Sequence, residues 1–182
     1  MALSGISSTF LNARSNIKRG LITSLLGFAI SLITYLFAKD QLIIWGVLNG
    51  LGLSMIIGGL FEKYISDKIY PILILAFTIT YKVPSGLLLD YKFFNELYNL
   101  NLFPLGFPGT SFYSSDYFPL IPWIFAFLSG VSFGKYLKRR NSFNFDFKDN
   151  ILAKIGRHSM LIYISHQIIL YPLVSTIYKL TL

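Results

Sequence analysis

Apolar residues gather in five runs along the chain, and short polar stretches separate one run from the next. The runs cover residues 21–37, 42–61, 69–83, 119–137 and 156–178. A helix needs roughly 20 mostly apolar residues to cross the hydrocarbon core of a bilayer. The third run is the shortest and ends at Pro84, which cannot continue a helix. The pattern predicts an all-α fold, a polytopic transmembrane helix bundle with five spans.

Residues 1–11 form a further apolar stretch that is too short to span a membrane. It lacks the positively charged start of a signal peptide. We therefore expect a partial N-terminal helix whose beginning is absent, and a chain that is a fragment or a truncated gene product. We expect residues 1–182 to form a single integral-membrane domain.

The composition agrees with a membrane protein. Of 182 residues, 54% are hydrophobic and only 13% are charged, whereas about 25% are charged in an ordinary soluble domain. The sequence has no cysteine, which excludes disulfides and thiolate chemistry. The net charge of +8 would suit a nucleic-acid partner, but the placement of the basic residues favours another explanation.

Basic residues are concentrated on alternate connections between the runs. Twelve lie on one set: Arg14, Lys18, Arg19, Lys63, Lys68, Lys135, Lys138, Arg139, Arg140, Lys148, Lys154 and Arg157. Four lie on the other: Lys39, Lys82, Lys92 and Lys179. The positive-inside rule places the richer set in the cytoplasm. We therefore expect a cytoplasmic loop at 138–154, an extracytoplasmic loop at 84–118 and a C-terminus outside, with membrane lipid rather than nucleic acid as the partner.

The 84–118 segment is rich in Tyr, Phe, Asn, Gly and Pro. Connections of this length are usually functional or disordered, and the aromatic residues favour an ordered lid at the interface. Residues 87–101 are expected to include a short amphipathic helix. Small residues four apart, such as Gly46 with Gly50 and Gly130 with Gly134, allow helices to approach closely, either within one chain or in a homo-oligomer.

Among the polar side chains of the apolar runs, Asn49, His166 and Gln167 lie well inside a run, where lipid would reject them. Such groups either serve a function or form hydrogen bonds between helices. A histidine is well suited to act as general base in acyl transfer, because its pKa lies near neutrality. The sequence shows no metal-ligand cluster, no Ser-His-Asp spacing and no glycine-rich phosphate loop that would select another chemistry.

Further candidates lie at the ends of the last two runs. Asp116 lies at the outer face, where it joins a polar pathway or caps the helix that follows. Tyr117 and Trp123 belong to the same region or to an interfacial aromatic belt. Arg157 and His158 are topology signals or an anion site at a helix N-terminus, suited to a phosphate-bearing donor such as an acyl-CoA.

Several segments together resemble a known family. They are residues 3–8 (LSGISS), 17–21 (IKRGL), 44–53 (IWGVLNGLGL), 116–123 (DYFPLIPW), 155–159 (IGRHS) and 161–167 (LIYISHQ). In this order they resemble the catalytic domain of the heparan-alpha-glucosaminide N-acetyltransferase family, in its bacterial branch. Members of that family begin earlier, with a span that carries a histidine associated with acetyl transfer, and bacterial relatives often have histidine at the position of Asn49.

The resemblance implies an integral-membrane acyltransferase that moves acetyl from cytoplasmic acetyl-CoA to an extracytoplasmic sugar or envelope glycan. It implies a location in a bacterial plasma membrane and no metal. The implied catalytic residues are His166 and Asp116. The implied binding residues are Asn49, Tyr117, Trp123, Arg157, His158 and Gln167. Two alternatives stay open: a non-catalytic or truncated membrane protein of the same fold, and a small transporter.

Overall fold

The computed structural model of the chain describes residues 1–142, 155–156, 158–159, 162–163, 165 and 177. They belong to two compact units, Met1–Phe143 and Asn144–Leu182, and each unit is described by itself. Every regular element among the described residues is a helix, which confirms the all-α fold class.

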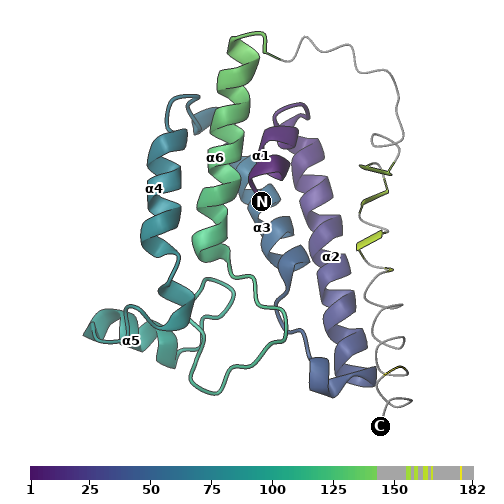
Figure 1. Cartoon of the computed structure of the whole chain (residues 1–182), viewed down its shortest axis with the longest axis vertical. Helices are drawn as coiled ribbons and strands as arrows, with labels where there is room; N and C mark the ends of the chain where they lie inside the picture. The colour runs from purple at the N-terminus through teal and green to yellow at the C-terminus, as the bar shows by residue number, and fades with distance from the viewer. Residues whose placement is uncertain (143–154, 157, 160–161, 164, 166–176, 178–182) are drawn as a thin grey trace. The chain divides into compact units, whose positions relative to one another are not determined.

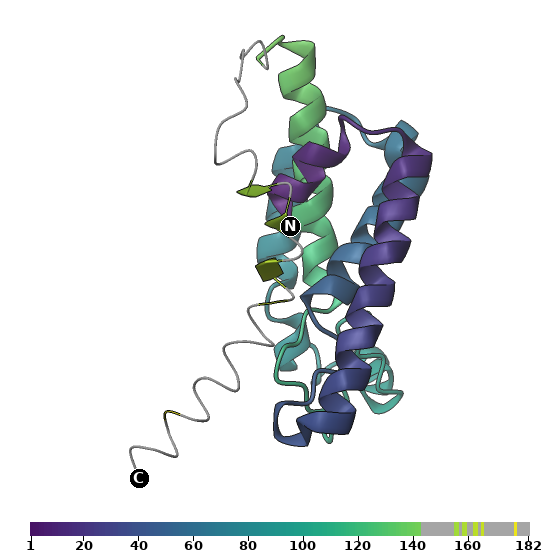
Figure 2. The ribbon, with the colours of Figure 1, turned by 90° about the vertical axis from the view of Figure 1, so that its right-hand side faces the viewer.

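Six α-helices form the first unit. They are α1 (Ala2–Ser8), α2 (Ala13–Phe37), α3 (Val47–Phe61), α4 (Tyr70–Thr80), α5 (Lys92–Asn99) and α6 (Leu120–Arg139). In Figure 1, α2 lies beside α3, while α1 and α4 pack on α6. The short α5 and the long connections around it lie at the end of the bundle where α6 begins, and Figure 2 shows the same arrangement from the side.

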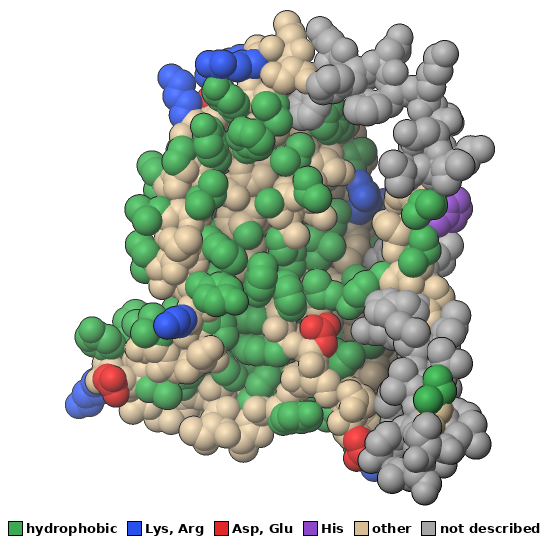
Figure 3. Space-filling model, viewed as in Figure 1, with side chains coloured by type: hydrophobic (Ala, Val, Ile, Leu, Met, Phe, Trp, Pro, Cys, Tyr) green, Lys and Arg blue, Asp and Glu red, His purple; other side chains and the backbone are tan. Residues whose placement is uncertain are grey.

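Two of these helices, α2 and α6, are long and apolar enough to cross a membrane. Helices α3 and α4 have 15 and 11 residues and are shorter than a full span. Large apolar side chains are exposed along the outer faces of α2 and α4, among them Leu25, Leu32, Ile72 and Ile79. Figure 3 shows apolar side chains spread over the face of the helical bundle. Exposed apolar surface of this extent marks an interaction surface.

Two of the predicted runs are helical over only part of their length. In the second run, residues 42–46 are not α-helical, and α3 begins at Val47 because the preceding backbone pairs with residues near Asp116. The third run is α-helical only over Tyr70–Thr80, and the chain then enters a 3₁₀ turn at Val83–Ser85 that contains Pro84. The fourth predicted run corresponds closely to α6.

The connection between α3 and α4 meets the end of α6. The Lys135 ammonium donates to the backbone oxygens of Glu62 and, at 2.9 Å, Ile65. Arg139 forms an ion pair with Asp67 at 2.7 Å. The α3–α4 connection and the end of α6 therefore lie at one end of the bundle. The charge pattern predicts that both face the cytoplasm. The predicted extracytoplasmic segment lies at the other end (Figure 1).

The small-residue faces pack within the chain. A Cβ on Gly130 would lie 2.0 Å from the backbone oxygen of Ala2, so α1 and α6 approach at a distance that only glycine permits. A Cβ on Gly20 of α2 would lie 2.6 Å from the backbone oxygen of Gly52 on α3. These contacts hold α1 against α6 and α2 against α3.

The 84–118 segment is ordered around an aromatic cluster. Tyr98 on α5 packs with Val83 and Phe107, and all three side chains are buried. Helix α5 lies within the range where an amphipathic helix is predicted, with Phe94, Leu97 and Tyr98 on its packed side. The short helix predicted within residues 87–101 is therefore present.

The described residues of the second unit fall within the last predicted run, except Ile155, which immediately precedes it. They are helical at residues 155–156, 159, 162–163, 165 and 177. The backbone N–H of Ile162 donates to the oxygen of His158 at 3.0 Å, as expected in an α-helix. Arg157, His166 and Gln167 lie outside the described residues.

Candidate functional site

Two segments far apart in the sequence run side by side at the start of α3. The backbone N–H of Ser115 donates to the oxygen of Leu42 at 2.9 Å, and that of Phe118 to the oxygen of Trp45 at 3.0 Å. Trp45 and Tyr117 form a parallel bridge. We call residues 42–47 with 114–118 the α3 junction. It brings together two of the sequence motifs, 44–53 and 116–123.

Asp116 caps α3 from within this junction. Its Oδ2 accepts a hydrogen bond from the backbone N–H of Val47, the first residue of the helix, at 3.1 Å. The N-cap residue is Gly46, where a Cβ would lie 2.8 Å from the same oxygen. The carboxylate thus lies at the positive end of the α3 dipole, where a negative charge is stabilising.

One expectation for Asp116 is wrong. A cap on the helix that follows would place its carboxylate on α6, but the N-cap residue of α6 is Pro119 and no side chain caps that end. The preceding strand-like pairing turns the Asp116 side chain toward α3 instead.

Asn49 lies in the first turn of α3 and is 1% exposed. Neither its Oδ1 nor its Nδ2 has a hydrogen-bond partner among the described residues. The Asn49 amide packs against Gly27 of α2, where only a glycine leaves room for it. A Cβ on Gly27 would lie 2.3 Å from Asn49 Oδ1. The described residues thus give no interhelical hydrogen bond to this side chain, although an unpaired buried polar group costs about 1–3 kcal/mol.

Trp45 adds a second buried polar atom, four residues before Asn49. Its indole Nε1 is buried and has no hydrogen-bond partner in the described part of the chain. Edge-to-face contacts with Phe28 and Phe103, at 6.0 and 6.1 Å between ring centroids, hold the ring in place. Sequence reasoning did not single out Trp45 as a site residue. The signal was an indole four positions before an amide inside an apolar run.

Tyr117 serves as an anchor in the junction. Its hydroxyl donates to the backbone oxygen of Phe103 at 2.7 Å. Burial raises the pKa of the Tyr117 phenol far above its ordinary value, with a smaller contribution from Tyr98. The group therefore stays protonated at physiological pH and acts as a hydrogen-bond donor, not as a base.

Trp123 stacks within an aromatic group at the start of α6. Its ring lies on Phe118 with 4.3 Å between centroids and an interplanar angle of 22°. It also contacts Phe77 of α4 at 5.4 Å. The indole thus joins the junction to α4 and α6.

The structure gathers four of the predicted site residues, Asn49, Asp116, Tyr117 and Trp123, around the start of α3 and of α6. His158 is exposed in the second unit. Arg157, His166 and Gln167 fall outside the described residues.

A family model described as "Heparan-alpha-glucosaminide N-acetyltransferase, catalytic" matches residues 1–168. No curated protein and no solved structure matches the chain. The matched range contains the whole α3 junction and both histidines.

Proposed function

Because the chain belongs to the heparan-alpha-glucosaminide N-acetyltransferase catalytic family, a family of membrane acetyltransferases, we propose that it carries acetyl groups across a membrane. The donor is acetyl-CoA on the cytoplasmic side. The acceptor is a sugar hydroxyl or amine of an envelope glycan outside a bacterial plasma membrane. Five spans cross that membrane, and the 84–118 segment and the C-terminus lie outside.

The observation that best supports a binding site is the buried, unpaired amide of Asn49 beside the α3 junction. An amide carries two N–H donors and a carbonyl acceptor. A ligand that pairs with these groups recovers the free energy that burial alone costs. The Trp45 N–H, four residues earlier in the chain, is also buried without a partner among the described residues and offers another donor. An acetyl carbonyl and a sugar hydroxyl are both suitable partners for such groups.

Asp116 has two tasks in this proposal. One of its oxygens caps α3 and so fixes the turn that carries Asn49. A carboxylate offers about four acceptor sites, so it can also accept a hydrogen bond from an acceptor hydroxyl. Tyr117 and Trp123 hold the backbone and rings around it.

His166 acts as the general base. It takes the proton from the acceptor hydroxyl or amine while the acceptor oxygen or nitrogen attacks the thioester carbonyl of acetyl-CoA. The C–S bond then breaks, and the proton passes to the departing CoA thiolate. Arg157, His158 and Gln167 bind the donor, with the two basic residues facing its phosphates.

The proposal is tested with membranes that contain the protein, labelled acetyl-CoA and an extract of envelope glycans. Label in the glycan fraction supports acetyl transfer. Asp116→Asn is expected to raise the KM for the acceptor and leave that for acetyl-CoA near its original value. An effect confined to acetyl-CoA would contradict the proposed sidedness. No transfer by an inserted protein, with acceptor present, would favour the non-catalytic alternative.

A further inference from the structure

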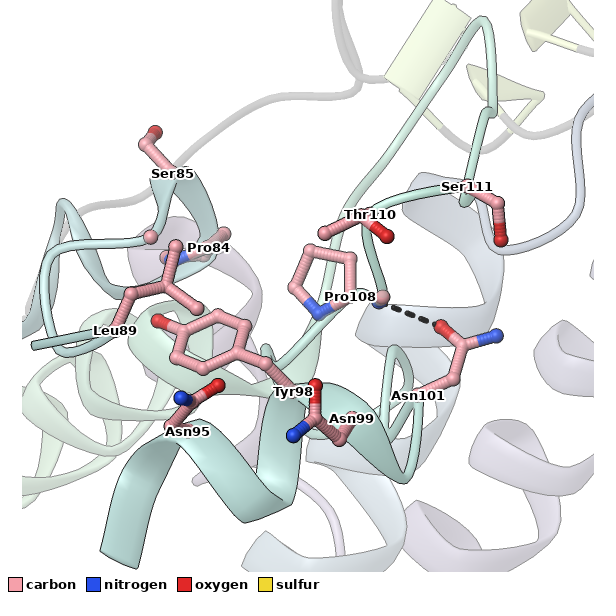
Figure 4. A pocket seen from close by; sticks show the side chains of 12 residues that line it. Pro84, Ser85, Leu89, Asn95, Tyr98, Asn99, Asn101, Pro108, Thr110 and Ser111 are labelled. Carbon is pink, nitrogen blue, oxygen red and sulfur yellow. Dashed lines mark hydrogen bonds between the residues drawn. The ribbon is translucent and has the colours of Figure 1, made fainter. Parts of the chain in front are cut away.

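An uncharged cleft of about 390 Å³, with both polar and apolar lining residues, lies within the 84–118 segment (Figure 4). Three stretches line it: residues 84–89 after α4, one face of α5, and residues 101–111. None of the lining residues is charged. The volume falls within the range of small-molecule sites, about 300–1,000 Å³.

The walls of the cleft are held in place by hydrogen bonds. The Tyr98 ring is buried at the α5 side, and its hydroxyl donates to the backbone oxygen of Val83. On the opposite side, Asn101 Oδ1 accepts from the backbone N–H of Gly109 at 2.7 Å (Figure 4). These bonds tie α5 to the turn after α4 and close the 101–109 loop, so the cleft is already formed.

Five side chains offer hydrogen-bonding groups toward a ligand. Asn95 and Asn99 are four apart on α5 and so share one face of the helix. Ser85, Thr110 and Ser111 add hydroxyls from the other two stretches. Within the described part of the chain, no side-chain hydrogen bond engages any of these five.

We propose that this cleft binds an uncharged stretch of oligosaccharide, as a subsite for the acceptor glycan of the proposed function. Amides and hydroxyls both donate and accept hydrogen bonds, as sugar hydroxyls do. Leu89, an exposed side chain that lines the cleft, supplies apolar surface for the C–H face of a sugar.

Charge argues against an anionic ligand. The charged positions nearest the lining residues in the sequence are Lys82, Asp90, Lys92 and Glu96, two basic and two acidic, so they give no net charge. A site for a phosphate or a uronic acid would be expected to present arginine or lysine. The cleft presents none.

The cleft shares its backbone with the α3 junction. The loop that contains Phe103 and Leu105 lies between Asn101 and Pro108, both of which line the cleft. Tyr117 donates to Phe103, and the backbone N–H of Ile121 donates to Leu105 at 3.0 Å. A glycan chain in the cleft would thus lie on the same ordered segment as Asp116.

The double variant Asn95→Ala/Asn99→Ala tests the proposal. Both residues are exposed, and alanine favours helix, so α5 is expected to remain folded. Glu96→Ala is the matched control, since it lies on the same helix but not in the cleft. The full chain in lipid nanodiscs is applied to an array of neutral and acidic glycans of matched length. We expect binding to neutral glycans, weakened at least about tenfold in the double variant and unchanged in the control.

No binding to any neutral glycan would overturn the cleft proposal, and so would equal binding by the double variant and the wild-type protein. Acetyl transfer separates this proposal from the proposed function. If the wild type transfers acetyl, the double variant should show a raised acceptor KM with kcat nearly unchanged, and an unchanged KM would refute the cleft alone. Neutral-glycan binding without transfer would refute the acetyltransferase function and leave the cleft standing.

Discussion

The carboxylate of Asp116 accepts a hydrogen bond from the backbone N–H of Val47 at 3.1 Å, across 69 positions of sequence. This bond joins the outer-face motif to the start of α3. It also explains why Gly46 precedes the helix, since a Cβ there would collide with the carboxylate. The same bond orients the turn that carries the unpaired Asn49 amide.

Removal of this cap should destabilise the protein. Asp116→Ala is expected to lower the free energy of unfolding by about 1 kcal/mol, the usual cost of a lost N-cap. Asp116→Asn retains an acceptor oxygen and should cost less. Unfolding of both variants in detergent micelles measures the difference. Equal stability of Asp116→Ala and the wild-type protein would show that the cap contributes nothing.

The variant Asn49→Leu should affect acetyl transfer without lowering stability. The amide is buried without a partner, so an apolar side chain of similar size should leave stability unchanged or raise it by about 1 kcal/mol. Acetyl transfer by the same variant should fall, because the donors for the ligand are gone. Transfer at the wild-type rate would remove Asn49 from the site.

Asn16→Leu is the matched control for that experiment. Asn16 is also buried, but its Nδ2 donates to the backbone oxygen of Ser8 at 2.9 Å. Loss of this bond should lower the free energy of unfolding by about 1 kcal/mol or more. If both leucine variants were destabilised equally, the unpaired state of Asn49 would be in doubt.

The contact between α1 and α6 depends on Gly130. Gly130→Ala places a Cβ 2.0 Å from the backbone oxygen of Ala2 and should lower the free energy of unfolding by about 1–3 kcal/mol. Gly156→Ala is the control, since a Cβ there meets nothing within 4 Å. Thermal unfolding of the two variants tests the contact. Equal midpoints would mean that α1 does not pack on α6 as described.

Tyr117→Phe should change the response to alkaline pH. The pKa of the buried phenol is raised in the folded protein, whereas an unfolded tyrosine loses its proton near pH 10. The folded state therefore retains the proton longer, and this contribution to stability is present below about pH 10 and is lost as pH rises further. Stability measured from pH 8 upward should decline less steeply in Tyr117→Phe. Parallel curves for both proteins would contradict the proposed burial.

The all-α class, the helix that became α6 and the short amphipathic helix could be predicted from the sequence. Apolar runs and Pro84 carry that information locally. The extended backbone at residues 42–46 could not be predicted, since it depends on pairing with residues 114–118. A run of apolar residues does not show at which residue the helix begins when a carboxylate from a distant segment caps its first turn.

The candidate site was predictable in part. Asp116, Tyr117 and Trp123 were singled out by their motif, and Asn49 by its polarity within an apolar run. The direction of the Asp116 side chain was not predictable, because a capping residue can serve a helix on another segment as well as its own. Trp45 was missed because an indole in an apolar run resembles ordinary packing until its N–H proves unpaired.

The most direct test of the central claim compares the wild-type protein with His166→Ala. Membranes that contain equal amounts of each protein are given labelled acetyl-CoA, and acetyl is measured in the envelope glycans. We expect transfer by the wild type and none by His166→Ala, with membrane insertion unchanged. Equal transfer by both proteins would remove His166 from the mechanism. No transfer by an inserted wild-type protein with acceptor present would contradict the acetyltransferase function itself.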